Sequence, residues 1–193
     1  GIGQLSISQV SNDGFYDWNL ENGEVYFSPN GTAITGYTSE EIQPDFRAWE
    51  RLAHPDDIAA VMKAVGEHLE GRTAKYEAEY RVRIKTGEWK WIMDRGQVVA
   101  RNAEGHPLRL VGTIRDITVR KKAEAALLQS EQKFYKVFQC NPDPVALTTL
   151  NEGRYVEIND AFVKITGYER SETIGRTVQD LGIWADPKDR KRL

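Results

Sequence analysis

Two stretches of this chain have nearly the same sequence, and this repeat is the strongest constraint on how the chain can fold. Residues 32–41 read TAITGYTSEE, and residues 163–172 read VKITGYERSE. The similarity extends upstream, where Val25 in the first copy corresponds to Val156 in the second. Such a recurring unit predicts two related domains in tandem. The long stretch that follows the first copy has no counterpart after the second.

The composition is that of an ordinary globular protein, with 40% hydrophobic and 28% charged residues. A net charge of −3 gives no electrostatic reason to expect nucleic acid or an anionic membrane as a partner. The single cysteine, Cys140, excludes an internal disulfide and is typical of a reducing compartment. No apolar run reaches the roughly 20 residues that span a bilayer. We therefore expect a cytoplasmic segment without membrane contact, in a parent protein for which a membrane anchor stays open.

The sequence of the first copy and the stretch after it predict an α+β fold. Two short aromatic-rich strands flank Asn22-Gly23, a pair typical of a tight hairpin turn. Short helices and one longer amphipathic helix follow. Apolar and charged residues then alternate over residues 76–84 with the period of a strand that has one packed face. Strands over 89–101 and 108–118 complete five antiparallel strands, with the helices on one face.

Seven short motifs in this order resemble those of a PAS domain with its PAC-type C-terminal half. They are Tyr16-Asp17-Trp18, Tyr26-Phe27-Ser28-Pro29, Ile34-Thr35-Gly36-Tyr37, Leu52-Ala53-His54-Pro55-Asp56-Asp57, Tyr80-Arg81-Val82-Arg83, Gly87-Glu88-Trp89-Lys90-Trp91-Ile92 and Gly112-Thr113-Ile114-Arg115-Asp116-Ile117-Thr118. The resemblance implies a PAS-like sheet and a role in sensing.

The resemblance also divides the chain into four parts. Residues 1–13 are expected to form an N-terminal cap or linker, and residues 14–118 a PAS/PAC domain. Residues 119–139 are expected to form a signalling linker helix. Residues 140–193 are similar to the opening of a second PAS domain, truncated before its last three strands.

The linker helix is predicted by its residues alone, because it contains no Gly or Pro and is rich in helix formers. A seam typical of a two-helix coiled coil, with residues spaced alternately by four and three, is formed by Ala123, Leu127, Ser130, Phe134 and Val137. A helix that simply packs along its own domain explains the same residues equally well.

The resemblance assigns signal transmission to the end of the last strand and to this helix. In PAS proteins an Asp-Ile-Thr sequence ends the last strand and leads into a signalling helix, and Asp116, Ile117 and Thr118 match it here. A rigid connection at this point would let a change in the sheet reposition the helix.

PAS proteins bind ligands between the inner face of the sheet and the short helices, so the resemblance implies a pocket there. Its candidate lining residues are Trp18, Tyr26, Ile34, Trp49, Val61, Met62, Val65, Tyr80, Trp91 and Ile114. Packing without a ligand is the alternative for each of them, since aromatic residues dominate cores in any case. Trp89 and Trp91 share one face of their strand, and the sequence leaves open whether that face points inward or outward.

We expect this chain to have no bound cofactor and no metal site. Haem-binding PAS domains use a histidine on the longer helix, which makes His68 the one conceivable iron ligand, although its angular position predicts that it points partly to solvent. Light-oxygen-voltage domains, which are flavin-binding relatives, need a cysteine where the second copy has Val178, and the first copy has none. The sequence therefore excludes covalent flavin photochemistry and leaves non-covalent flavin open.

The residues show no Ser-His-Asp, Cys-His or paired-carboxylate arrangement, so we expect no enzymatic activity in this segment. The leading hypothesis is a sensory module that responds to a small ligand or partner and transmits a conformational signal through the linker helix. The output would be a histidine kinase or diguanylate cyclase domain of the same polypeptide in a bacterial signalling protein, expected to act as a homodimer. The alternative is a ligand-free PAS domain that serves dimerisation or structure.

Overall fold

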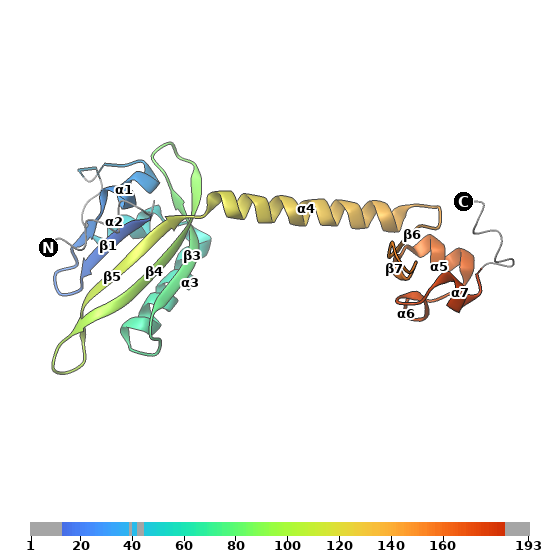
Figure 1. The fold of residues 1–193 in the computed structure, drawn as a ribbon. Helices are drawn as coiled ribbons and strands as arrows, with labels where there is room; N and C mark the ends of the chain where they lie inside the picture. Colours follow the sequence, from blue (N-terminus) through green and yellow to red (C-terminus); the bar gives the residue numbers. More distant parts are fainter. Residues whose placement is uncertain (1–12, 39, 42–44, 184–193) are drawn as a thin grey trace. The chain divides into compact units, whose positions relative to one another are not determined.

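The structure is a computed structural model that describes residues 13–38, 40–41 and 45–183. The N-terminal segment before residue 13 and the last ten residues of the second domain lie outside the described part. The chain divides into two compact units, Gly1–Ala123 and Glu124–Leu193 (Figure 1). Among the described residues, no helix has both the length and the apolar character needed to span a bilayer.

The first unit contains a five-stranded antiparallel sheet in the order β2-β1-β5-β4-β3. The strands are β1 (Gly14–Asn19), β2 (Val25–Phe27), β3 (Tyr76–Arg83), β4 (Trp89–Arg101) and β5 (Pro107–Asp116). Hairpin turns join β1 to β2 and β3 to β4, as the sequence predicts. β5 is the central strand and pairs with both β1 and β4. The predicted PAS-like sheet is thus confirmed.

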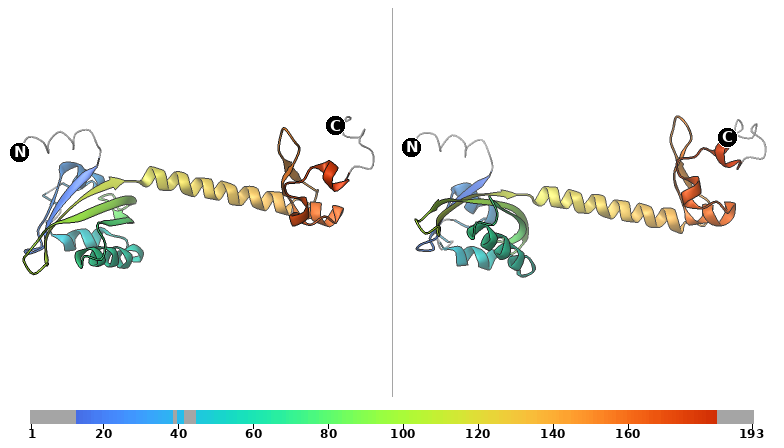
Figure 2. Two further views of the ribbon diagram at one scale, coloured as in Figure 1. Left: turned by 60° about the horizontal axis from the view of Figure 1, so that its bottom comes forward. Right: turned by 90° about the horizontal axis from the view of Figure 1, so that it is seen from below.

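Three helices precede β3: α1 (Pro29–Thr35), α2 (Phe46–Leu52) and α3 (Pro55–Leu69). α2 and α3 cover one face of the sheet, as Figure 2 shows. Side chains cap both: Asp45 accepts from the N–H of Ala48 at 2.6 Å, and His54 accepts from the N–H of Asp56 at 3.2 Å. Between the sheet and these helices lies the core, which includes the fully buried Tyr80, Ile92 and Ile114.

A long helix, α4 (Thr118–Cys140), follows β5 after a single intervening residue. It leads into the second unit, where β6 (Ala146–Thr148) and β7 (Tyr155–Ile158) form a two-stranded sheet. Three short helices follow: α5 (Asp160–Thr166), α6 (Arg170–Thr173) and α7 (Val178–Leu181). The core of this unit is a small cluster around Tyr155, Ile158, Phe162 and Leu181.

The two units contain the same hairpin–helix motif, in agreement with the sequence repeat. In each copy, one side-chain oxygen caps the N-terminus of the first helix by accepting a hydrogen bond from its backbone. The Ser28 hydroxyl accepts from the N–H groups of Phe15 at 2.9 Å and of residue 31 at 3.2 Å. In the second unit, Asn159 Oδ1 accepts from the N–H groups of Val145 and of residue 162, both at 2.9 Å. Each oxygen therefore links the helix start to the beginning of the hairpin.

Candidate functional site

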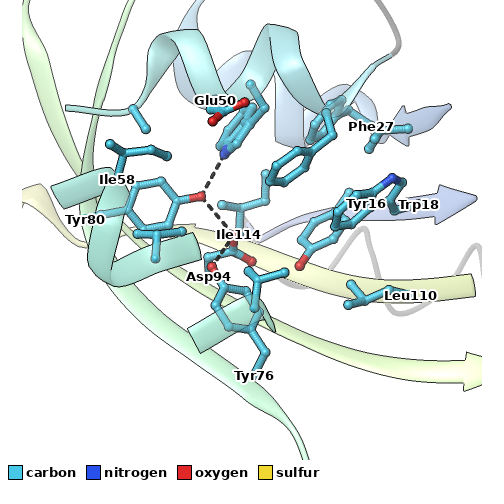
Figure 3. Close-up of a pocket in the computed structure, with 16 residues that line it drawn as sticks. Tyr16, Trp18, Phe27, Glu50, Ile58, Tyr76, Tyr80, Asp94, Leu110 and Ile114 are labelled. Carbon is cyan, nitrogen blue, oxygen red and sulfur yellow. Dashed lines mark hydrogen bonds between the residues drawn. The ribbon is translucent and has the colours of Figure 1, made fainter. Parts of the chain in front are cut away.

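A small cavity of about 30 Å³ lies between the inner face of the sheet and helices α2 and α3 (Figure 3). The 16 residues that line it are Tyr16, Trp18, Val25, Phe27, Phe46, Trp49, Glu50, Ala53, Ile58, Val61, Val65, Tyr76, Tyr80, Asp94, Leu110 and Ile114. The lining is mostly apolar and aromatic, and it contains no lysine, arginine or histidine. A volume of this size holds one or two water molecules.

The carboxylate of Asp94 is the centre of a buried hydrogen-bond cluster in this cavity. Its Oδ2 accepts from the hydroxyls of Tyr80 at 2.8 Å and Tyr76 at 3.1 Å. The indole N–H of Trp49 donates to the Tyr80 oxygen at 2.7 Å. Tyr16 points its hydroxyl toward the same carboxylate (Figure 3). Asp94 is only 7% exposed, and yet its Oδ1 has no hydrogen-bond partner.

Burial sets the protonation behaviour of this cluster. Loss of hydration raises the pKa of Asp94 from 3.8 to about 6, although the neighbouring tyrosine hydroxyls oppose the shift by donating to the carboxylate. The pKa values of the Tyr76 and Tyr80 hydroxyls are raised well above the usual value, first by burial and then by the negative charge of Asp94. The tyrosines therefore stay protonated as donors, and Asp94 is the group that titrates close to neutral pH.

Two glycines in neighbouring strands make room for Tyr16. Gly96 in β4 and Gly112 in β5 are paired with each other, and Gly112 is also paired with Tyr16 in β1. A Cβ atom on Gly112 would lie 2.3 Å from Cζ of Tyr16, and one on Gly96 would lie 2.7 Å from the Tyr16 hydroxyl. Only glycine at both positions lets the tyrosine ring lie across the sheet toward Asp94.

The structure brings part of the predicted lining set together. Of the candidates named from the sequence, those at the cavity are Trp18, Trp49, Val61, Val65, Tyr80 and Ile114. Trp18 stacks on Phe46 with ring centroids 4.3 Å apart, which places both rings on the inner face. That these residues contact a ligand stays a prediction.

Four other candidates lie elsewhere. Ile34 is buried in the core without lining the cavity. Met62 is 37% exposed, because it lies beside Val61 on the solvent side of α3. Tyr26 is 57% exposed, because in β2 its neighbours Val25 and residue 27 point inward and strand alternation turns Tyr26 outward.

Trp91, the fourth of these, lies on the outer face of β4. The neighbouring Ile92 is fully buried, so strand alternation directs Trp91 away from the core. Its ring contacts two cations: the guanidinium of Arg81 lies 5.4 Å from the ring centroid, and the ammonium of Lys121 in α4 lies 5.0 Å from it. Trp91 is therefore associated with the start of α4 and not with the cavity.

His68 is buried, and the expectation that it points partly to solvent is wrong. It is 3% exposed. Its Nε2 accepts from the N–H of Val98 at 2.9 Å, and its Nδ1 donates to the carbonyl of Thr73 at 2.8 Å. Both ring nitrogens are thus occupied in tying α3 to β4, and His68 does not line the cavity. This arrangement provides no iron ligand.

The size and lining of the cavity also show whether a flavin or a haem could fit into it. A cavity of about 30 Å³ is far below the roughly 300 Å³ or more of ordinary small-molecule pockets, so neither flavin nor haem fits this side-chain arrangement. No cysteine lines the cavity, and Cys140 is an exposed residue at the end of α4. Within the described part of the chain, no group of three or more His, Cys, Asp or Glu residues is placed to hold a metal ion.

The predicted transmission residues Asp116, Ile117 and Thr118 form a hydrogen-bonded joint between β5 and α4. The N–H of Ile117 donates to the Trp91 carbonyl at 2.9 Å, and the side chain of Ile117 is buried. The hydroxyl of Thr118 accepts from the Trp91 N–H at 3.1 Å. Asp116 accepts from the N–H of Thr118 at 2.9 Å and pairs with Lys90 at 2.9 Å. Each residue of the joint is thereby held to the neighbouring strand β4.

The first turn of α4 is held to the sheet by a further charge cluster. Glu79 in β3 accepts from Arg120 and pairs with Lys121, each at 2.6 Å. These contacts, that of Lys121 first, lower the pKa of Glu79. The seam residues farther along the helix are exposed, with Leu127 at 62% and Phe134 at 55%, and Ala123 is exposed as well.

Sequence reasoning missed the polar centre of the cavity, Asp94, and its partners Tyr16 and Tyr76. The sequence did contain an indication that Asp94 is buried. Asp94 lies two residues after Ile92, so the two side chains point to the same, packed face of β4. An acidic residue on the packed face of a strand indicates a buried charge.

Comparison with known proteins identifies both units. The model for the PAS fold matches residues 24–114, and a second model, for the PAS domain, matches residues 132–193. The crystal structure of a sensory box histidine kinase/response regulator from Burkholderia thailandensis superposes with a TM-score of 0.60 and 39% identity. The match covers 69% of this chain and 97% of that one.

Two curated relatives are sensors. The two-component sensor PprA of Pseudomonas aeruginosa is 29% identical over 150 residues, which are 76% of this chain and 16% of the relative. A methyl sulfide methyltransferase-associated sensor of Methanosarcina acetivorans is 29% identical over 136 residues, 69% of this chain and 14% of the relative. The chain thus spans no more than 16% of the length of either. Together with the sheet, its helices and the repeated hairpin–helix motif, these matches show that the chain belongs to the PAS family, with one PAS match in each of its two units.

Proposed function

We propose that this chain is the sensory part of a signalling protein, in which the first unit receives a signal and α4 carries it onward. The observation that supports this most directly is the course of β5. Leu110 and Ile114 of this strand line the cavity, and α4 begins only four residues after Ile114. Because β5 is the central strand, a change in packing around the cavity would shift the start of α4.

The proposed output is a histidine kinase or diguanylate cyclase domain of the same polypeptide in bacterial signal transduction. Two relatives, a two-component sensor and a sensory box histidine kinase, support the kinase. We propose no enzymatic activity for residues 1–193 themselves. The single cysteine suits a reducing compartment, so we place this segment in the cytoplasm.

A homodimer through α4 is part of this proposal. Leu127, Phe134 and Val137 are more than half exposed on this helix, and they lie at coiled-coil spacing. A second copy of the same helix would cover them. The seam is short and includes alanine and serine, so we expect it to need other contacts for a stable dimer.

The proposal is tested by changing the rotational phase of α4, that is, the angle by which the helix turns the downstream residues relative to the first unit. Residues 1–140 are joined to the catalytic region of a histidine kinase, and autophosphorylation is measured. Deletion of Gln129 turns everything downstream by about 100° relative to the first unit, whereas deletion of residues 124–130 removes nearly two whole turns and restores the phase. We expect the single deletion to change autophosphorylation by several-fold and the seven-residue deletion to restore it. Equal activity in all three proteins would contradict the proposal.

A second candidate function is a ligand-free dimerisation domain. The small volume of the cavity, about 30 Å³, favours it. Mass spectrometry of the denatured pure protein and its absorption spectrum distinguish the two, since a sensor that retains its ligand releases a small molecule and a dimerisation domain releases none.

A further inference from the structure

We propose that the cavity of the first unit binds a small protonated amine, whose ammonium group donates a hydrogen bond to Oδ1 of Asp94. The inference rests on the proposed role of the first unit as the receiving domain, and it names the ligand class that this domain recognises.

The first argument is the unpaired oxygen. Oδ2 of Asp94 accepts from the hydroxyls of Tyr76 and Tyr80, and the Tyr16 hydroxyl points toward the carboxylate and lowers its pKa. Oδ1 nevertheless has no partner of hydrogen-bond geometry, although the residue is only 7% exposed. A buried acceptor without a donor is rare in folded proteins and costs free energy. Trp18 Nε1 also lacks a partner, and Trp18 lines the same cavity. Among the described residues of the first unit, the buried side-chain atoms without partners thus belong to two residues that line this cavity.

The second argument is charge. The titratable groups that line the cavity are Asp94 from β4, Tyr16 from β1, Tyr76 and Tyr80 from β3, and Glu50 from α2. None of them is a cation, so the negative charge of Asp94 has no counter-charge in the lining. A ligand with a positive charge supplies it, and a carboxylate or phosphate ligand would be repelled.

The third argument is the chemistry of the remaining lining. Besides the apolar side chains, seven aromatic residues line the cavity together with Asp94: Tyr16, Trp18, Phe27, Phe46, Trp49, Tyr76 and Tyr80. Aromatic rings attract cations through their negative faces, and desolvation strengthens that attraction. A carboxylate among aromatic rings therefore suits an ammonium group that carries one or two methyl or methylene groups.

The volume limits the size of the ligand. About 30 Å³ holds a molecule of no more than about two non-hydrogen atoms without a change in the lining. Methylammonium meets this limit and has N–H donors. Tetramethylammonium is larger and has no N–H donor, while methanol has the size of methylammonium but no charge.

The experiment is a titration of the whole 193-residue chain with methylammonium chloride, followed by the NMR signals of the indole N–H groups. Sodium chloride, tetramethylammonium chloride and methanol are the control titrants. We expect a saturable shift of the Trp49 indole signal with methylammonium alone. We expect binding at least tenfold weaker in Asp94→Asn and unchanged in Glu104→Gln, which removes the same charge from an exposed turn.

A pH profile of the unaltered protein provides a second readout. Methylammonium stays charged from pH 5 to pH 8, whereas Asp94 takes up a proton over this range because its pKa is about 6. Affinity should be about tenfold lower at pH 5 than at pH 8. This readout decides the question if Asp94→Asn does not fold.

Three results would overturn the inference: no saturable shift with methylammonium, an equal shift with methanol, or affinity that does not fall at pH 5. In the first case the cavity holds water only. None of these results affects the phase test of α4, which needs no ligand. A failed amine titration together with a phase-dependent output would therefore reject the ligand class and leave the proposed function intact.

Discussion

Asp94 couples the stability of the first unit to pH, because its carboxylate is buried with one oxygen unpaired. Its folded pKa of about 6 exceeds the ordinary value of 3.8, so folding favours the protonated form. The stabilisation by protonation is complete below about pH 4 and is lost as the pH rises through 6. The difference amounts to at most about 3 kcal/mol.

Asp94→Asn removes this pH dependence and keeps the side-chain volume. We expect the variant to be more stable than the original protein by about 1 kcal/mol at pH 4.5, and this advantage to grow to about 3 kcal/mol at pH 8. Urea unfolding of both proteins at pH 4.5, 6 and 8 measures the effect. Other ionisable groups cancel in the comparison, so a stability difference that stays constant with pH would show that Asp94 is not the responsible group.

Strand alternation located some residues of the site correctly from the sequence and misplaced others. It placed Trp18, Tyr80 and Ile114 on the packed face, where the structure has them. It could not decide the direction of Trp91, because both faces of β4 carry large side chains and the pairing with β3 settles which face packs. The partners of His68 come from β4 and from the loop after α3, so helix periodicity alone could not reveal that it is buried.

Among the elements, α4 depends on its first turn for a fixed direction out of the first unit. Glu79 pairs with both Arg120 and Lys121 in that turn. Glu79→Gln should weaken both contacts, so we expect the amides of residues 121–125 to exchange hydrogen several-fold faster. The free energy of unfolding should change by less than about 1 kcal/mol, because the groups are partly exposed.

Glu77→Gln is the matched control for this prediction. Glu77 lies in the same strand and pairs with Arg95 at 2.9 Å, a residue of the sheet and not of α4. The variant removes an equivalent salt bridge without touching the helix. Equal exchange of the α4 amides in the two variants would show that Glu79 does not hold the helix start.

The helices and strands were largely predictable because their ends depend on local chemistry. Asn22-Gly23 is a turn, and helix α4 contains no Gly or Pro to interrupt it. The contacts that fix α4 to the sheet were not predictable, since Glu79 and Lys121 are 42 residues apart in sequence and meet only once the sheet has formed.

In the whole molecule, the two units differ in the size of their cores. The first has a five-stranded sheet packed against helices. In the second, the residues up to 183 that the structure describes form two strands and a cluster of four buried residues. Two strands with so little buried surface are marginally stable. After correction for intrinsic rates, we expect the amides of β6 and β7 to exchange at least about a hundredfold faster than those of β4 and β5. Comparable protection in both sheets would contradict this.

The tandem organisation could be predicted from the sequence, because a repeat can be recognised without knowing any long-range contact. Residues 32–41 and 163–172 mark the same position after each hairpin, at the ends of α1 and α5. The cavity chemistry was less accessible, because the cluster around Asp94 joins β1, β3, β4 and α2, and no single stretch of sequence contains it.

Ser28 and Asn159 have a consequence for how such domains diverge. A hydroxyl in one unit and an amide oxygen in the other connect corresponding pairs of backbone N–H groups, one at the start of the hairpin and one at the start of the helix. The position therefore requires an oxygen atom of the right reach, which serine and asparagine both supply. PAS domains whose sequences have diverged too far to be aligned should still have a short polar side chain between the hairpin and the first helix. A comparison of structures could look for that side chain at this position.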